Sequence, residues 1–181
     1  MSESGTTSID LPALVRSAAG DWTLDPTASS VEFHVKHFWG AMTVHGHFDK
    51  VSGEGHVQAD GSVSGRLLIA AGSVTTKNKK RDKHLRSGDF FDAEHHPTMT
   101  IGASGLVPSG SQDLRGTITL DTAGHQQNLD TVVHVVEATA DAVTLRAEAN
   151  VDRTAFGMTW GPLGMTSPQA RALVTANFVR T

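Results

Sequence analysis

Residues 73–101 have the sequence SVTTKNKKRDKHLRSGDFFDAEHHPTMTI, which places one helical pattern between two strand-like ends. Thr76 or Asn78 can cap a helix over residues 76–87, because a side-chain oxygen there accepts a hydrogen bond from a free N–H group of the first turn. Most of the residues that follow are good helix formers, with Leu85 as the main apolar anchor. The segment therefore predicts a strand, a helix and a returning strand.

Outside this segment, apolar and polar residues alternate along the chain, as they do in half-buried strands. The alternating runs are 31–36, 42–48, 57–59, 63–69, 114–121, 143–152 and 174–179. Asp60-Gly61 separates two of these runs and is a strong hairpin signal. Residues 104–112 and 157–169 are rich in Gly, Pro and Ser, and we expect loops there. The pattern predicts an all-β antiparallel sandwich or closed barrel, and periodicity does not separate the two.

The N-terminal residues have a different character. A short amphipathic helix is expected behind Asp10 as N-cap, with Pro12 in its first turn and Gly20 at its end. Its apolar residues, spaced at i, i+3, i+4 and i+7, are Leu11, Leu14, Val15 and Ala18. We expect a polar tail with this helix at residues 1–20 and a β domain at residues 21–181.

Composition and charge exclude several classes of function. The chain of 181 residues has a formal net charge of −4. This argues against a nucleic-acid binder, because neutralising phosphates needs a basic face. The chain has no cysteine, which excludes disulfides, thiolate metal sites and a cysteine nucleophile. The N-terminus has neither the charged start nor the apolar core of a secretory signal, so we expect a cytoplasmic protein.

The segment 73–101 resembles the signature of the YceI-like family, roughly S-[IV]-x-T-x-N-x-x-R-D-x-H-L-x-[ST]-x-D-F-F-D followed by a proline and an apolar strand. The residues in register are Arg81, Asp82, His84, Leu85, Asp89, Phe90, Phe91, Asp92 and Pro97. Further matching pieces are Leu24-Asp25, 29–33, His37, 46–48, Asp152-Arg153 and 156–158, so the resemblance covers about residues 22–181. Two departures are the stretch 120–129, which lacks the family's usual compact Gly-x-Thr turn, and His96, where the family more often has an aromatic residue.

What the resemblance implies is an extended eight-stranded antiparallel β-barrel, lipocalin-like in shape, with the helix of residues 76–87 near one opening. In the family, a long apolar tunnel holds polyisoprenoid chains, including the tails of quinones. We therefore expect a protein that binds, stores or transports an apolar isoprenoid-type ligand, such as a polyisoprenoid or an isoprenoid quinone, and requires no other cofactor. The resemblance also makes a homodimer an expectation.

The strand faces and the motif together predict which side chains line this tunnel. Small residues on inward faces, Gly46, Gly65 and Ala149, are expected to leave room for a ligand between larger apolar ones. The expected ligand-binding residues are Phe33, Val35, Met42, Val44, Phe48, Leu67, Leu85, Phe90, Phe91, Met99, Ile101, Leu145, Phe156, Met158 and Trp160. Leu85, Phe90 and Phe91 are expected to close the barrel beneath the helix.

Two groups of histidines could bind a metal, but polar surface is the favoured interpretation of both. His45 and His47 share a strand face at a spacing that can chelate, while the apolar residues of the same strand put the core on the opposite face. The second group, in a loop before a proline, is Asp92, Glu94, His95 and His96. Its neighbouring histidines cannot both point inward from an extended chain. No metal site is predicted.

A basic run within the helical segment allows two interpretations. It consists of Lys77, Lys79, Lys80, Arg81, Lys83 and Arg86, interrupted by Asp82. A solvated helix face is the simpler interpretation. The functional alternative is transient contact with anionic lipid headgroups, which would place the barrel mouth at a membrane surface. Arg81 and Asp82 could instead pair with other parts of the barrel.

The sequence contains no catalytic motif of the types that mark a nucleophile or a nucleotide site, such as GxSxG, SxxK or a glycine-rich phosphate loop. A binding protein is therefore the leading hypothesis. The alternative is an enzyme that uses the apolar cavity to cyclise or isomerise a hydrophobic metabolite. A third hypothesis is a surface-interaction or stress protein with a fully packed barrel.

Overall fold

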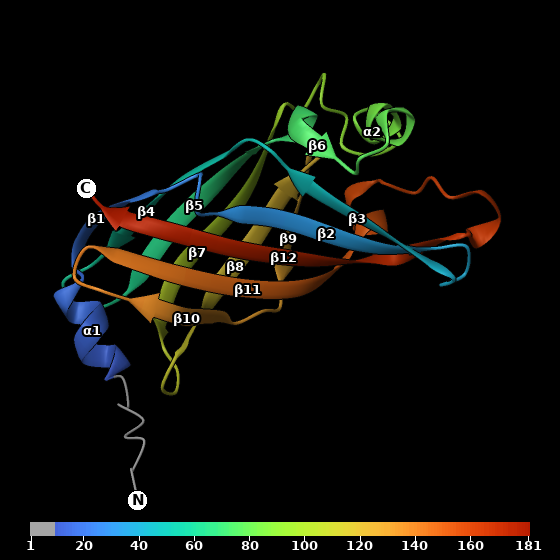
Figure 1. The fold of residues 1–181 in the computed structure, drawn as a ribbon. Helices are drawn as coiled ribbons and strands as arrows, with labels where there is room; N and C mark the ends of the chain where they lie inside the picture. Colours follow the sequence, from blue (N-terminus) through green and yellow to red (C-terminus); the bar gives the residue numbers. More distant parts are fainter. Residues whose placement is uncertain (1–9) are drawn as a thin grey trace, which may run out of the picture.

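The computed structural model describes residues 10–181, so the polar tail expected before Asp10 lies outside the described residues. The fold consists of β-strands with two short α-helices and three 3-10 turns (Figure 1). In chain order the elements are α1 (Leu11–Ser17), β1 (Gly20–Leu24), β2 (Ser30–His37), β3 (Met42–Phe48), β4 (Val51–Val57), β5 (Val63–Ala70), η1 (Ala71–Ser73), β6 (Val74–Thr75), α2 (Lys79–Leu85), β7 (Thr98–Pro108), β8 (Asp113–Thr122), β9 (His125–Leu129), β10 (Val133–Ala138), β11 (Ala142–Asp152), η2 (Arg153–Phe156), η3 (Pro162–Gly164) and β12 (Thr166–Arg180).

Eight strands form a closed antiparallel ring in the order β1-β4-β5-β7-β8-β10-β11-β12. The ring closes because β12 also pairs with β1, with Leu24 opposite Phe178 and Trp22 opposite Arg180. The side chains of each strand alternate between the interior and solvent, which produced the period of two in the sequence. The eight-stranded antiparallel barrel that the resemblance implied is confirmed.

The long strand β12 extends the barrel wall beyond this ring. Its C-terminal residues pair with β1, whereas residues between Thr166 and Thr175 pair with β2. The sheet then continues from β2 through β3 to β6, and β9 is added next to β8. Figure 1 shows β2 and β3 running past the ring at the end away from α1. The interior is therefore long rather than round.

The two helices lie at opposite ends of the barrel (Figure 1). In α1, the Asp10 side chain accepts a hydrogen bond from the Ala13 N–H, as expected of its N-cap. The expected end at Gly20 is wrong: α1 ends at Ser17, and Gly20 begins β1 with a φ of +127° that suits glycine. In α2, Asn78 is the N-cap, and the helix covers Lys79–Leu85 rather than the whole of 76–87.

Both expected loops are partly strand. β7 continues to Pro108 across an irregularity in register between Ser104 and Val107, and this bulge interrupts the alternation that would have revealed the strand. β12 begins at Thr166 and has a similar irregularity before Ala170. The stretch 120–129 forms a hairpin of β8 and β9 with a two-residue turn at Ala123-Gly124, both with positive φ. The turn is thus compact despite its different sequence.

Buried apolar side chains form two clusters along the barrel. One lies toward α1 and contains Leu11, Trp22 and Leu106. The other lies toward α2 and contains Ile69, Val74 and Phe156. No helix within residues 10–181 has the length and apolar character needed to cross a bilayer. The barrel thus has two apolar interior regions in series.

Candidate functional site

Each of the two interior regions contains a cavity. The smaller cavity, of about 490 Å³, lies toward α1, and the larger, of about 610 Å³, lies toward α2. Their linings share four side chains, Ile101, Ile118, Ala147 and Val174, one from each of β7, β8, β11 and β12. We call these four residues the waist. The cavities are therefore consecutive chambers of one lumen, each of a size typical of small-molecule sites.

The smaller chamber is covered at its outer end by α1, whose residues form part of its lining. Leu11 and Val15 are buried against the barrel, and the Trp22 indole N–H donates to the Ala18 carbonyl at 2.9 Å. Arg180 holds the helix in place from the last strand. Its guanidinium donates to the carbonyls of Ala19 and Ser17 and lies 4.8 Å above the Trp22 ring. The helix α1 therefore covers this end of the lumen.

The larger chamber is lined by aromatic and aliphatic side chains from strands and from the segment after α2. Phe33, Phe48 and Phe91 form an aromatic cluster with ring centroids 5.4–6.0 Å apart. Phe91 is held beneath α2 by a hydrogen bond from its N–H to the Leu85 carbonyl. At the mouth, Trp160 packs on His84 and Phe90 with edge-to-face or tilted geometry. The segment from α2 to Phe91 thus covers the larger chamber, and the aromatic side chains of His84, Phe90 and Trp160 lie together at its mouth.

Fourteen of the fifteen expected tunnel residues line one of the chambers. Leu67 and Leu145 line the smaller chamber, Ile101 lines both, and the others line the larger. The prediction that Met42 lines the tunnel is wrong. Met42 lies at the start of β3, where this strand extends past the barrel, and its side chain is 52% exposed. Binding of a ligand by the fourteen stays a prediction.

Of the three small residues expected to leave room, Gly46 does not. The ring of Phe33, its cross-strand partner, lies so close that a Cβ on Gly46 would be 2.2 Å from Cζ of that ring. Gly65 lines the smaller chamber and Ala149 lines the larger. The ring of Phe33 therefore fills the space beside Gly46, and no room for a ligand remains there.

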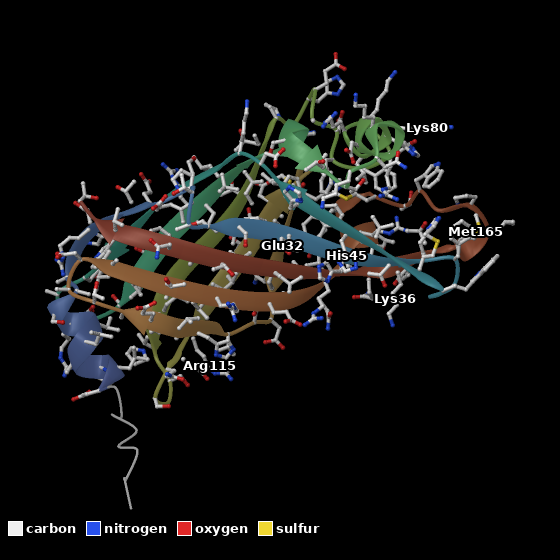
Figure 2. All side chains as sticks on the ribbon, viewed as in Figure 1. Glu32, Lys36, His45, Lys80, Arg115 and Met165 are labelled. Atoms are coloured by element: carbon white, nitrogen blue, oxygen red, sulfur yellow. The ribbon has the colours of Figure 1, made fainter. Side chains whose placement is uncertain are left out.

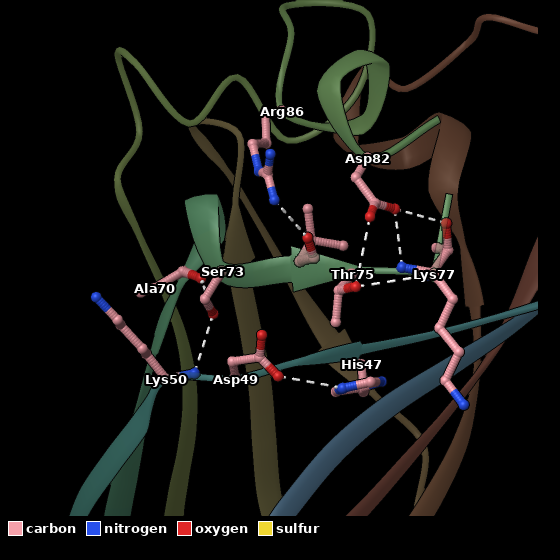
Figure 3. Close-up of polar contacts among 11 residues, drawn as sticks. His47, Asp49, Lys50, Ala70, Ser73, Thr75, Lys77, Asp82 and Arg86 are labelled. Carbon is pink, nitrogen blue, oxygen red and sulfur yellow. Dashed lines mark hydrogen bonds and ion pairs between the residues drawn. The ribbon is translucent and has the colours of Figure 1, made fainter. Parts of the chain in front are cut away.

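The charged residues of the motif attach α2 to the barrel wall (Figure 3). Asp82 is buried, and its carboxylate accepts hydrogen bonds from the Thr76 N–H at 2.8 Å, the Thr76 hydroxyl at 2.6 Å and the Thr75 hydroxyl. Arg81 donates to the hydroxyl and carbonyl of Thr76. Arg86 donates to the carbonyls of Gly72 and Val74. Arg81 and Asp82 therefore pair with the protein itself, through hydrogen bonds to Thr75 and Thr76 at the edge of the sheet.

Two polar groups of the larger chamber were missed at the sequence level. Arg153 is 7% exposed, and its guanidinium donates to the carbonyls of Met158, Trp160, Thr166 and Ser167. Burial lowers the pKa of Arg153. Thr122 is 3% exposed, and its hydroxyl has no hydrogen-bond partner among the described residues. The match of Asp152-Arg153 to the family was the one sequence signal for Arg153, and no sequence signal pointed to Thr122.

Most of the histidines contact an acidic side chain or another aromatic ring. His45 and His47 lie outside the lumen, His45 packed on His34 at 4.1 Å between centroids and His47 at 3.1 Å from Asp49. In the loop before Pro97, His95 hydrogen-bonds to Asp92 at 2.8 Å, which raises the pKa of His95. Residues 10–181 contain no group of three or more side chains arranged to hold a metal ion.

An antiparallel ring of eight strands around an apolar two-chamber lumen defines a lipocalin-like barrel with an internal cavity. The chain belongs to the YceI-like family, because the model of the YceI-like domain matches residues 22–178. That match agrees with the resemblance seen in segment 73–101.

Curated relatives match part of the chain, and solved structures share its fold. UPF0312 protein SAR2769 of Staphylococcus aureus is 34% identical over 91 residues, which cover 49% of this chain and 53% of that protein. The chain thus matches about half the length of such relatives. BcnA of Burkholderia cenocepacia superposes with a TM-score of 0.77 at 20% identity, over 85% of this chain and 98% of that one. A polyisoprenoid binding domain from Saccharophagus degradans superposes with a TM-score of 0.73 at 18% identity, over 88% and 98%.

Proposed function

We propose that this protein binds one isoprenoid chain along its two-chamber lumen and stores or carries it. The observation that carries the proposal is the lumen itself, which runs from α1 to α2 and is lined almost throughout by apolar side chains. A second support is the fold shared with a polyisoprenoid binding domain. A polyisoprenoid or the tail of an isoprenoid quinone is the ligand that such a lumen would take.

The energetics favour a long, flexible, apolar ligand. Each buried CH₂ group contributes roughly 0.8 kcal/mol, and ordering the chain offsets part of this. Of the side chains that line the larger chamber, Thr122 and Arg153 are the buried polar ones. The guanidinium of Arg153 uses four of its five N–H groups on carbonyls, whereas the Thr122 hydroxyl has no partner among the described residues and is the group we expect to meet a ligand oxygen. A prenol or quinone with one oxygen near Thr122 fits this arrangement.

Mass spectrometry of an organic extract of freshly purified protein tests the proposal. Stoichiometric prenyl lipid is the expected result. An empty barrel that converts a hydrophobic metabolite would support the enzyme alternative instead, and an empty barrel without turnover would contradict both. Transport of such a ligand would bring the barrel into transient contact with a membrane. We also propose the homodimer that the family resemblance implies, and light scattering of the purified protein would give its molar mass.

A further inference from the structure

Exposed apolar side chains gather at one end of the molecule. Residues 10–181 expose eight large apolar side chains, and five of them lie on two neighbouring loops and their borders. These five, Phe38, Trp39, Met42, Trp160 and Leu163, are here called the apolar tip. Trp39 is 72% exposed and Leu163 is 86% exposed. A concentration of this kind marks an interaction site rather than ordinary surface.

The two loops form one structural unit. The Trp39 N–H donates to the Met165 carbonyl at 3.3 Å, and the His37 ring hydrogen-bonds to the Thr166 hydroxyl at 2.8 Å. Through Trp160, which packs on His84, the tip adjoins α2 and the mouth of the larger chamber. Figure 1 shows both loops at the end of the barrel opposite α1.

The backbone of the tip is held in an uncommon conformation. Phe38, Trp39 and Leu163 have φ values of 49°, 52° and 54°, in the left-handed region that bulky residues rarely adopt. Glycine would fit these positions with less strain. Large apolar residues are instead kept at turns where most of Trp39 and Leu163 meets solvent, which indicates a role outside the folded core.

Lysines lie on two elements that border this tip. Lys79, Lys80 and Lys83 lie on α2, and Lys36 lies near the end of β2. Figure 2 shows Lys80 on one side of the tip and Lys36 on the other. Within the described part of the chain, none of these four lysines forms an ion pair. In a chain of net charge −4, these four lysines therefore offer unpaired positive charge to an anionic surface.

We propose that the apolar tip inserts into the surface of an anionic lipid bilayer while these lysines contact the headgroups. Tryptophan, phenylalanine and leucine bordered by lysine are typical of segments that lie in the membrane interface. Each lysine near an anionic surface adds attraction, which is lost at high salt. The same lysines would face one another if a second copy covered the tip, and their repulsion favours the bilayer. The inference extends the proposed function by placing the chamber mouth at the membrane.

Vesicles without any isoprenoid test this inference separately from cargo binding. We expect delipidated protein to sediment with vesicles of phosphatidylcholine and phosphatidylglycerol, and much less with phosphatidylcholine alone. The Trp39→Ser/Leu163→Ser variant should bind about tenfold more weakly. Its matched control is Val107→Ser/Val179→Ser, which changes two apolar side chains of 48% and 39% exposure that lie outside the tip. That control should bind like the wild type.

Further measurements separate the competing outcomes. Brominated lipids should quench the fluorescence of the wild type more than that of Trp39→Phe, which keeps only the 40% exposed Trp160 of the tip and the buried Trp22. Reversing Lys79, Lys80 and Lys83 to Glu should remove the preference for phosphatidylglycerol. Self-association that the tip variant abolishes would overturn the inference. Loss of vesicle binding by the tip variant, with an unchanged prenyl content, would support the membrane inference. Equal vesicle binding by the tip variant and the wild type, with prenyl lipid still bound, would overturn the inference and leave the proposed cargo binding untouched.

Discussion

The ring of Phe33 lies over the backbone of Gly46, its cross-strand partner on β3. A Cβ at position 46 would be 2.2 Å from Cζ of that ring and 2.5 Å from Cε1. Phe33 also contacts Phe48 and Phe91, with centroids 5.8 and 6.0 Å away. The absence of a side chain at residue 46 therefore fixes where the aromatic wall of the larger chamber stands.

Replacing Gly46→Ala should force the Phe33 ring to move. Overpacking of this kind costs about 1–3 kcal/mol, which chemical denaturation of the delipidated protein measures. Gly72→Ala is the control, because a Cβ there meets only Ala93 at 4.0 Å. In Phe33→Leu/Gly46→Ala the two losses should be less than additive. Full additivity would mean that the ring does not rest on Gly46.

The unpartnered hydroxyl of Thr122 gives a prediction with opposite signs for stability and binding. Thr122→Val removes a buried group without a hydrogen bond and should stabilise the empty barrel by about 1 kcal/mol. The same variant should retain prenols less well than hydrocarbons of equal length. Thr117→Val, on the exposed face of the same strand, is the control. A destabilised empty barrel would show that the hydroxyl has a partner after all.

The anchor of α2 at Asp82 should control both stability and retention. Asp82→Asn weakens the hydrogen bonds from Thr75 and Thr76, with an expected loss of about 1–3 kcal/mol. Hydrogen exchange should become faster in Lys79–Leu85, and bound lipid should leave faster. Asp141→Asn, at an exposed turn, serves for comparison. Unchanged exchange in α2 would contradict the anchoring role.

Two histidines should titrate on opposite sides of the ordinary value, about 6.5. Burial and the neighbouring His45 lower the pKa of His34, whereas Asp92 raises the pKa of His95. The contribution of His34 to stability is therefore present above about pH 6.5 and is lost as pH falls through its lowered value. The contribution of His95 is present below about pH 6.5 and is lost as pH rises through its raised value. NMR titration of the imidazole resonances checks both, and His45→Gln should move the pKa of His34 upward.

Much of the barrel was predictable from the sequence, because alternation is a local property. β5, β8, β11 and β12 follow directly from apolar residues on one face. β9 did not, since His125 to Asn128 are polar and exposed and have no apolar face. The end of β7 was hidden because its bulge shifts the inward positions by one.

The sequence predicted which strand faces point into the lumen, but it did not predict which side chains contact one another there. The strand pattern placed Phe33 inward, but only the register brings its ring over Gly46. Arg153 and its carbonyl partners are 5–14 residues apart, and no local rule relates them. Met42 shows the converse, because its strand extends past the barrel, where an inward face no longer means a buried one.

Blocking the waist tests the central claim, that one apolar chain occupies both chambers. Ala147→Phe places a ring among Ile101, Ile118 and Val174, at the junction of the two chambers. Val179→Phe places the same aromatic side chain at a position that is 39% exposed on the outer surface. Native mass spectrometry of the purified proteins should show that the waist variant is folded but retains about tenfold less prenyl lipid than the surface variant. Wild-type retention of the same lipid by folded Ala147→Phe would contradict the account.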